Sequence, residues 1–212
     1  MVITLWSVKG GSGVSVVAAG LAAVLARGGT DVLLVDLDGD QPALLGLPTP
    51  DGPGVRDWLA VADGDPAALG RLELDAAPSL RLVPRGDADG WSPERTGHLV
   101  DVLEADRRAV VVDAGPDAGP ASALRSAGTS LLVVRPCYLA LRRAVRARAT
   151  ADGVVLVEEP GRSLDVVDVE RALGAPVRAV IPWDPAVARA VDAGLLTARL
   201  PRGFARSLAS VT

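Results

Sequence analysis

Residues 2–26 read VITLWSVKGGSGVSVVAAGLAAVLA, and three different patterns follow one another along them. Residues 2–8 form a short apolar run with β-branched side chains, which predicts a buried strand. The glycine-rich segment 9–13 interrupts this run. Residues 15–26 are mostly Ala, Val and Leu and predict a helix, which the glycines after Arg27 end. A strand, a glycine-rich loop and a helix in this order are the setting that a phosphate-binding loop requires.

Further apolar runs predict the rest of a sheet, with seven strands in all. They lie at residues 32–36, 80–84, 109–113, 130–134, 154–157 and 177–181. Helical patterns fall between most of them, at residues 53–61, 92–105, 120–127, 139–149, 164–173 and 185–193. This alternation indicates βαβ units. We therefore expect an α/β fold with a doubly wound, mainly parallel seven-stranded sheet of the P-loop NTPase type. We expect residues 1–212 to form one domain, and residues 48–80 to be a peripheral helical excursion.

Composition and charge exclude several classes of protein. The 212 residues are 49% hydrophobic and include 26 acidic against 22 basic side chains. These values are typical of a globular protein without an overall positive field for nucleic acid or anionic lipid. A single cysteine, Cys137, excludes an internal disulfide, and a single histidine, His98, excludes a histidine-rich metal cage. No uncharged apolar run reaches about 18 residues, so we expect no signal peptide, no membrane span and a cytoplasmic location.

The loop 9–15 carries the residue types that bind nucleotide phosphates and magnesium. Backbone N–H groups can turn toward phosphate oxygens at Gly10, Gly11 and Gly13. Ser15 supplies a hydroxyl suited to Mg²⁺. Lys9 is the only lysine, and the other 21 basic residues are arginines. A single lysine in a chain that otherwise uses arginine suggests that Lys9 has a role for a compact ammonium that a planar guanidinium does not fill. The alternative for Lys9 is an ordinary surface lysine. The alternative for the loop is a merely tight βα turn rich in glycine.

Acidic residues end two of the predicted strands. Asp36 and Asp38 follow the strand at 32–36, and Asp113 ends the strand at 109–113. The carboxyl ends of parallel strands lie at one edge of a sheet, so we expect these side chains beside the glycine-rich loop. There they can orient Mg²⁺ through its waters or position an attacking water. We interpret Asp40 and Asp117 as turn residues outside the site.

These segments resemble the MinD/ParA family of deviant Walker A P-loop ATPases. KGGSG at 9–13 matches the signature lysine loop of that family, VLLVDLD at 32–38 its second acidic motif, and VVVDAGP at 110–116 its Walker B strand end. The similarity continues through residues 131–144 and 163–194. The closing part looks most like the CpaE/TadZ branch and like septum-site-determining or chromosome-partitioning homologues.

The resemblance implies a homodimer that forms across the nucleotide site with ATP and Mg²⁺ and positions a partner or cargo. The process would be division-site placement, chromosome partitioning or localisation of pilus or secretion machinery, with recruitment to a cell pole or septum. Lys9 would reach the partner's phosphates and Asp38 would orient the hydrolytic water. The implied metal shell is Ser15, Asp36 and Asp113. The implied nucleotide-binding set is Lys9, Gly10, Gly11, Ser12, Gly13, Val14, Ser15 and Glu158.

Two positions depart from the family pattern. Val14 stands where the P-loop lysine falls, and a charged hydrogen bond contributes about 1.5–3 kcal/mol, so we expect roughly ten- to hundredfold weaker nucleotide binding. Glu158 stands where an asparagine commonly reads adenine, and an ionised glutamate accepts hydrogen bonds but donates none. Two functions therefore stay open: a weak or slow ATPase that switches a dimer, and a non-hydrolysing pseudo-ATPase scaffold that binds a partner.

Three further features of the sequence have two interpretations each. Residues 200–211 place apolar side chains on one helical face, at Leu200, Phe204, Leu208 and Val211. We interpret this face as packing on the sheet, with a membrane-targeting amphipathic helix as the alternative. An arginine cluster at Arg142, Arg143, Arg146 and Arg148 is interpreted as a solvated helix face, with contact to DNA phosphates as the alternative. Trp6 and Trp183 are interpreted as core or interface aromatics.

Overall fold

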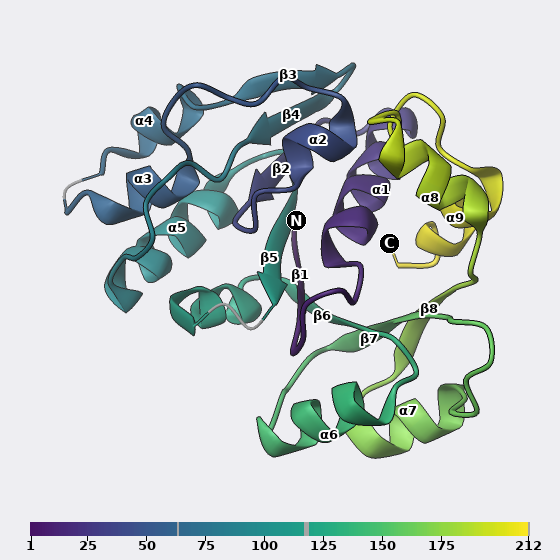
Figure 1. Ribbon diagram of the computed structural model, residues 1–212. Helices are drawn as coiled ribbons and strands as arrows, with labels where there is room; N and C mark the ends of the chain where they lie inside the picture. The colour runs from purple at the N-terminus through teal and green to yellow at the C-terminus, as the bar shows by residue number, and fades with distance from the viewer. Residues whose placement is uncertain (63, 117–118, 212) are drawn as a thin grey trace.

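A mainly parallel sheet runs through the computed structural model, which describes residues 1–62, 64–116 and 119–211 (Figure 1). Its strands are β1 (Val2–Ser7), β2 (Val32–Asp36), β3 (Leu74–Ala77), β4 (Leu80–Val83), β5 (Ala109–Pro116), β6 (Thr129–Val134), β7 (Gly153–Val157) and β8 (Val177–Ile181). Their spatial order is β3-β4-β2-β5-β1-β6-β7-β8. β3 pairs antiparallel with β4, and the other neighbouring pairs are parallel. The predicted α/β fold is confirmed.

The predicted number of strands is wrong, because the sheet that the described residues form has eight. The additional strand is β3, within the stretch that we expected to contain helices alone. Its four residues, LDAA, are too few and too weakly apolar to predict a strand on their own. Ion pairs hold this edge: Arg108 Nη2 lies 2.7 Å from Glu73 Oε1, and Arg81 Nε lies 3.3 Å from Glu73 Oε2. Two short helices lie within the stretch, α3 (Val55–Ala60) and α4 (Pro66–Gly70), and another short helix, α2 (Gln41–Leu45), precedes it.

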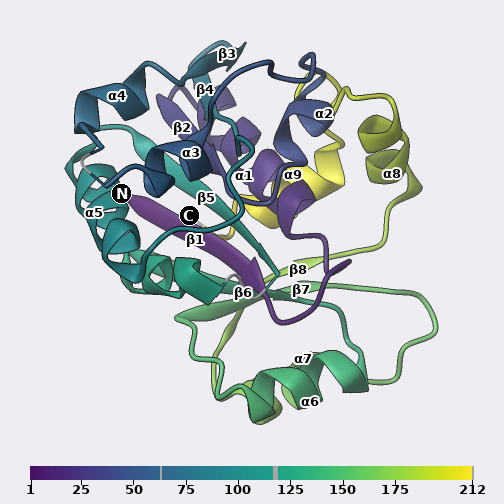
Figure 2. The same ribbon diagram turned by 60° about the vertical axis from the view of Figure 1, so that its left-hand side comes forward.

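Helices cover both faces of the sheet, as Figures 1 and 2 show. On one face lie α1 (Val14–Arg27), α8 (Pro185–Asp192) and α9 (Arg202–Leu208), and on the other α5 (Pro93–Ala105), α6 (Tyr138–Arg146) and α7 (Val166–Leu173). The central strands β1, β2 and β5 are buried on both faces and largely apolar, whereas the edge strands β3 and β8 are partly exposed. In β1, Ile3 and Leu5 pack toward the α1 layer, and Trp6 packs among residues of α6 and α7.

One predicted helix has a different form. Residues Gly119–Ser126 form a 3₁₀ helix, η1, where we expected an α-helix over 120–127. The carbonyl of Leu124 accepts from the N–H of Ala127 at 3.2 Å, an i→i+3 bond of the 3₁₀ kind, and also from Thr4 Oγ1 of β1 at 3.0 Å. Asp117 lies outside the described residues.

The C-terminal segment packs on α1. Phe204 and Leu208 of α9 and the preceding Leu200 are buried in the same core as the α1 layer. This confirms that the apolar face packs within the fold. Trp6 is also a core residue, and its Nε1 donates to Ser130 Oγ at 2.9 Å. Trp183 is not a core residue, since its side chain is 51% exposed. None of the helices in the described ranges combines the length and apolar character needed to cross a bilayer.

Substitution of Gly20 in α1 tests the packing of α9, and Gly97 in α5 serves as the control. A Cβ on Gly20 of α1 would overlap the Phe204 ring, whereas a Cβ on Gly97 of α5 meets no atom within 4 Å. Overpacking costs about 1–3 kcal/mol, which exceeds the roughly 0.5–1 kcal/mol that alanine gains over glycine in a helix. We therefore expect Gly20→Ala to lower the free energy of unfolding by about 1–2 kcal/mol and Gly97→Ala to raise it by about 0.5–1 kcal/mol. Urea denaturation measures both, and an increase for both variants would contradict the docking of α9 on Gly20.

Candidate functional site

The loop between β1 and α1 is shaped by its own hydroxyl groups. Ser7 Oγ and Ser12 Oγ both donate to the carbonyl of Lys9, at 2.9 and 2.8 Å. Gly13 precedes α1 with φ of 95°, a left-handed conformation that a side chain would strain. Added Cβ atoms at the loop glycines would meet nothing within 4 Å, so the loop faces open space. This space is a cavity of about 170 Å³, and Ser15, Asp38 and Asp40 also line it.

Lys9 and Val14 have opposite environments at the two ends of this loop. Lys9 is half-buried, but its Nζ makes a solvent-exposed hydrogen bond, donating to the carbonyl of Gly10 at 3.3 Å. Val14, the first residue of α1, is only 5% exposed and belongs to the apolar core. The cavity of the loop therefore receives no cation from position 14, while the ammonium of Lys9 lies at the surface.

Two buried carboxylates face each other at the carboxyl ends of β2 and β5. Asp36 and Asp113 are partners in the register of these strands, and both are fully buried. Burial raises the pKa of Asp36 to about 6. Burial, followed by the charge of Asp36, raises the pKa of Asp113 to about 7. The strand ends thus hold two acidic groups whose ionisation is coupled near neutral pH.

Asp36 holds the acidic loop that follows β2. Its Oδ1 accepts from the N–H groups of Asp38 at 3.0 Å and Gly39 at 2.7 Å, and its Oδ2 accepts from the N–H of Gln41 at 3.0 Å. Both oxygens are therefore used by the backbone. The expected part of Asp36 in a metal shell stays a prediction, and its observed contacts fix the position of Asp38.

Gln41 links Ser15 of α1 to Asp113 of β5, and its role was not predicted from the sequence. Its Nε2 donates to the carbonyl of Ser15 at 3.0 Å and to Asp113 Oδ2 at 2.7 Å. The side chain is fully buried, and its Oε1 has no hydrogen-bond partner in the described part of the chain. The sequence signal is weak, because a glutamine before Pro42 reads as an ordinary residue of a turn.

Asp38 and Ser15 lie together at the mouth of the cavity. Ser15 Oγ donates to Asp38 Oδ2 at 3.4 Å. Gly115, with φ of +64°, permits this approach, because a Cβ there would lie 2.7 Å from Asp38 Oδ1. Burial and the charge of Asp40 raise the pKa of Asp38, and the Ser15 hydrogen bond opposes them. Asp40, which we had interpreted as a turn residue outside the site, therefore lies beside it.

The oxygen donors at this site suit a Mg²⁺ ion that is also coordinated by waters and phosphate oxygens. Residues 1–62, 64–116 and 119–211 contain no group of three or more His, Cys, Asp or Glu side chains able to cage a metal. Mg²⁺ usually keeps several waters and binds through one or two carboxylates together with phosphate oxygens. The hydroxyl of Ser15 and the carboxylates of Asp38 and Asp113 match that requirement, provided that a phosphate occupies the loop.

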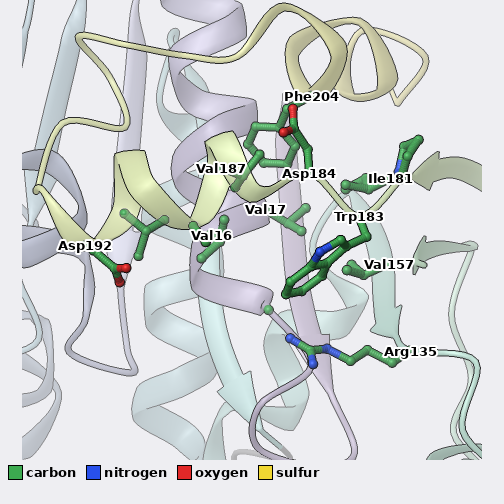
Figure 3. A pocket seen from close by; sticks show the side chains of 14 residues that line it. Val16, Val17, Arg135, Val157, Ile181, Trp183, Asp184, Val187, Asp192 and Phe204 are labelled. Carbon is green, nitrogen blue, oxygen red and sulfur yellow. The ribbon is translucent and has the colours of Figure 1, made fainter. Parts of the chain in front are cut away.

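A second cavity of about 230 Å³ begins at Gly13 and is largely apolar (Figure 3). Val16, Val157 and Trp183 are among its lining residues. Glu158 does not line it. This glutamate is exposed and lines another cavity, of about 360 Å³, with Pro182 and Trp183 common to both. The structure therefore brings most of the predicted site together but places Glu158 apart from the glycine-rich loop.

Comparisons with known proteins agree with this fold. The family model for the CobQ/CobB/MinD/ParA nucleotide binding domain matches residues 3–197. No curated protein matches the sequence.

Three similar solved structures share the fold. The MinD cell division protein of Aquifex aeolicus is 23% identical, with a TM-score of 0.81, over 99% of this chain and 93% of that one. The septum site-determining protein MinD of Pyrococcus horikoshii, complexed with Mg-ADP, is 22% identical, with a TM-score of 0.80 and coverages of 99% and 93%. A ParA family ATPase from Chlorobium tepidum is 22% identical, with a TM-score of 0.80 and coverages of 100% and 97%.

Proposed function

Since this chain belongs to the CobQ/CobB/MinD/ParA nucleotide-binding family, we propose that it binds Mg·ATP in the loop between β1 and α1. We further propose that ATP brings two copies together and that the dimer positions a partner or cargo in the cell. One observation carries the proposal. The ammonium of Lys9 makes a solvent-exposed hydrogen bond to the carbonyl of Gly10, where the phosphates bound to a second copy can reach it.

The described residues have separate parts in this function. Backbone N–H groups of the glycine-rich loop bind phosphate oxygens, and Ser15 and Asp113 hold the magnesium that accompanies them. Asp38 orients a water for attack, in the position that Asp36 and Gly115 fix. Phosphoryl transfer depends chiefly on positioning and electrostatic stabilisation, so the missing cation at position 14 makes hydrolysis weak or slow.

The finer parts of the proposal concern the protein's place in the cell. We propose that residues 1–212 act as a single domain around one sheet, and that the protein is cytoplasmic and recruited to a cell pole or septum. Division-site placement, chromosome partitioning and pilus or secretion machinery remain the candidate processes, and the CpaE/TadZ branch the candidate subfamily. The buried apolar face of α9 argues against a membrane anchor in the C-terminal segment. The arginines of α6 are exposed, as a solvated face requires.

A second candidate is the non-hydrolysing scaffold. The buried Val14 favours it directly, and the raised pKa values of Asp36 and Asp113 favour it because protonated carboxyl groups bind Mg²⁺ poorly. In this candidate the fold serves dimerisation and partner binding without a chemical step.

Val14→Lys separates the two candidates. We expect it to raise the affinity for Mg·ATP by about ten- to hundredfold, because the new ammonium starts at the first residue of α1 and reaches the phosphates. Val24→Lys places the same side chain near the far end of α1 and should leave the affinity unchanged. Calorimetric titration with Mg·ATP measures both, and a turnover assay follows the chemical step. If Val14→Lys gains neither affinity nor turnover, the loop is degenerate and the scaffold is the better account.

A further inference from the structure

Arg135 is a charged residue at the end of an apolar strand. It follows β6, which pairs with β1, so it lies at the same sheet edge as the glycine-rich loop. Arg135 and Gly13 line the same cavity. In Figure 3 the Arg135 side chain extends toward the start of α1, and Trp183 lines the same cavity. A cation from outside the loop therefore approaches the phosphate-binding segment.

The side chain of Arg135 has no partner in the described part of the chain. Its Nε is buried without an acceptor, and residues 1–62, 64–116 and 119–211 provide neither a hydrogen bond nor an ion pair for its guanidinium. Two other arginines whose Nε lacks an acceptor are held through their terminal nitrogens, Arg85 by the carbonyl of Gly86 and Arg95 by the carbonyl of Trp58. A buried donor without a partner at the wall of a cavity calls for an acceptor from a ligand.

The other charged groups around the cavity do not supply that acceptor. Asp184 Oδ1 accepts from the N–H of Ala186 at 2.8 Å and caps α8. Asp192 lies on α8 at the far side of the cavity from Arg135 in Figure 3. The rest of the lining is mainly apolar, which suits a nucleobase better than a phosphate.

We propose that Arg135 contacts the phosphate chain of the bound nucleotide and supplies the cation that the buried Val14 does not. This inference rests on the proposed function. A guanidinium matches two phosphate oxygens at once, which suits a site approached from the side. Arg135 and Gly13 line the apolar cavity together, so a base in this cavity places the phosphates next to the nucleoside beside Arg135. The contact is therefore to phosphates that ADP and ATP share.

The test compares Arg135→Ala with Arg162→Ala, which removes the same charge from the neighbouring cavity of Glu158. Calorimetry measures binding of ATP, ADP and adenosine in the presence of Mg²⁺. We expect Arg135→Ala to weaken ATP and ADP binding by about ten- to hundredfold and to leave adenosine binding unchanged. We expect Arg162→Ala to change each affinity by less than about twofold, as for a group that contacts no phosphate.

Further measurements distinguish a contact between Arg135 and the phosphates from a structural role of Arg135 and from failure of the proposed function. The unfolding temperature of ligand-free Arg135→Ala should not fall, because its guanidinium has no partner to lose, and Arg135→Gln gives a polar second variant. Val14→Lys added to Arg135→Ala should restore ATP binding. Normal ATP binding by Arg135→Ala, or an equal loss for adenosine, would overturn the role of Arg135 alone. A wild-type protein that binds no nucleotide would overturn the proposed function and this inference with it.

Discussion

Asp113→Asn is expected to stabilise the ligand-free protein at pH 8 by about 2–4 kcal/mol. The pKa of this buried carboxyl is raised from 3.8 to about 7. The folded protein therefore keeps its proton to a higher pH than the unfolded chain does. The contribution of Asp113 to stability is fully present below pH 3.8 and is lost as the pH rises through about 7. Asparagine removes this loss because it does not ionise.

Urea denaturation at pH 5 and pH 8 measures this effect. We expect the gain from Asp113→Asn to be larger at pH 8, where the wild-type carboxyl is ionised, than at pH 5. Asp101→Asn on α5 is the control, because Asp101 is exposed, and surface substitutions of this kind usually change stability by less than about 0.5 kcal/mol. An equal loss of stability for Asp113→Asn at both values would show that its hydrogen bonds with Gln41 and Gly115 matter more than its burial.

Lys9→Ala is expected to abolish the dimer that forms with Mg·ATP and to lower turnover by about 10³-fold, the size of effect known for a cation supplied in trans to a phosphoryl group. Sedimentation velocity with and without Mg·ATP measures the dimer, and phosphate release measures turnover. Within the described residues, the side chain of the half-buried Lys9 makes a single hydrogen bond, to the carbonyl of Gly10. We therefore expect the free energy of unfolding to stay unchanged.

Two controls sharpen the Lys9 prediction. Lys9→Arg keeps the charge but replaces the compact ammonium with a planar guanidinium, and we expect it not to restore the dimer. Arg143→Ala removes an exposed charge from α6 and should leave dimerisation intact. A Lys9→Ala protein that still dimerises on adding Mg·ATP would remove Lys9 from the proposed interface.

The sequence predicted the strands whose pattern is local. Residues of β1, β2 and β5 are continuous apolar runs with glycines or carboxylates at their ends, and the structure confirms them. β3 has no such pattern. Its position depends on pairing with β4 and on the ion pair between Glu73 and Arg108, which are 35 residues apart in the chain. Contacts of this range leave no periodicity to detect.

The same distinction applies to the site. The glycine-rich loop, Ser15 and the three carboxylates were predicted because each motif lies at the end of a strand or the start of a helix. Gln41 was missed because its importance arises from contacts with Ser15 and Asp113, which only the folded chain brings together. Arg135 offered a similar signal, since it stands directly after the apolar strand LLVV as Asp36 and Asp113 end theirs, but its direction toward Gly13 follows from the pairing of β6 with β1.

Binding of Mg·ATP to the purified wild-type protein tests the central claim most directly. Calorimetry at micromolar protein and up to millimolar nucleotide should give a dissociation constant in the micromolar range, because backbone N–H groups, Ser15, Asp38 and Asp113 remain in place despite Val14. Absence of detectable binding at millimolar Mg·ATP would contradict the account and leave the fold as a scaffold whose function lies on its partner surfaces.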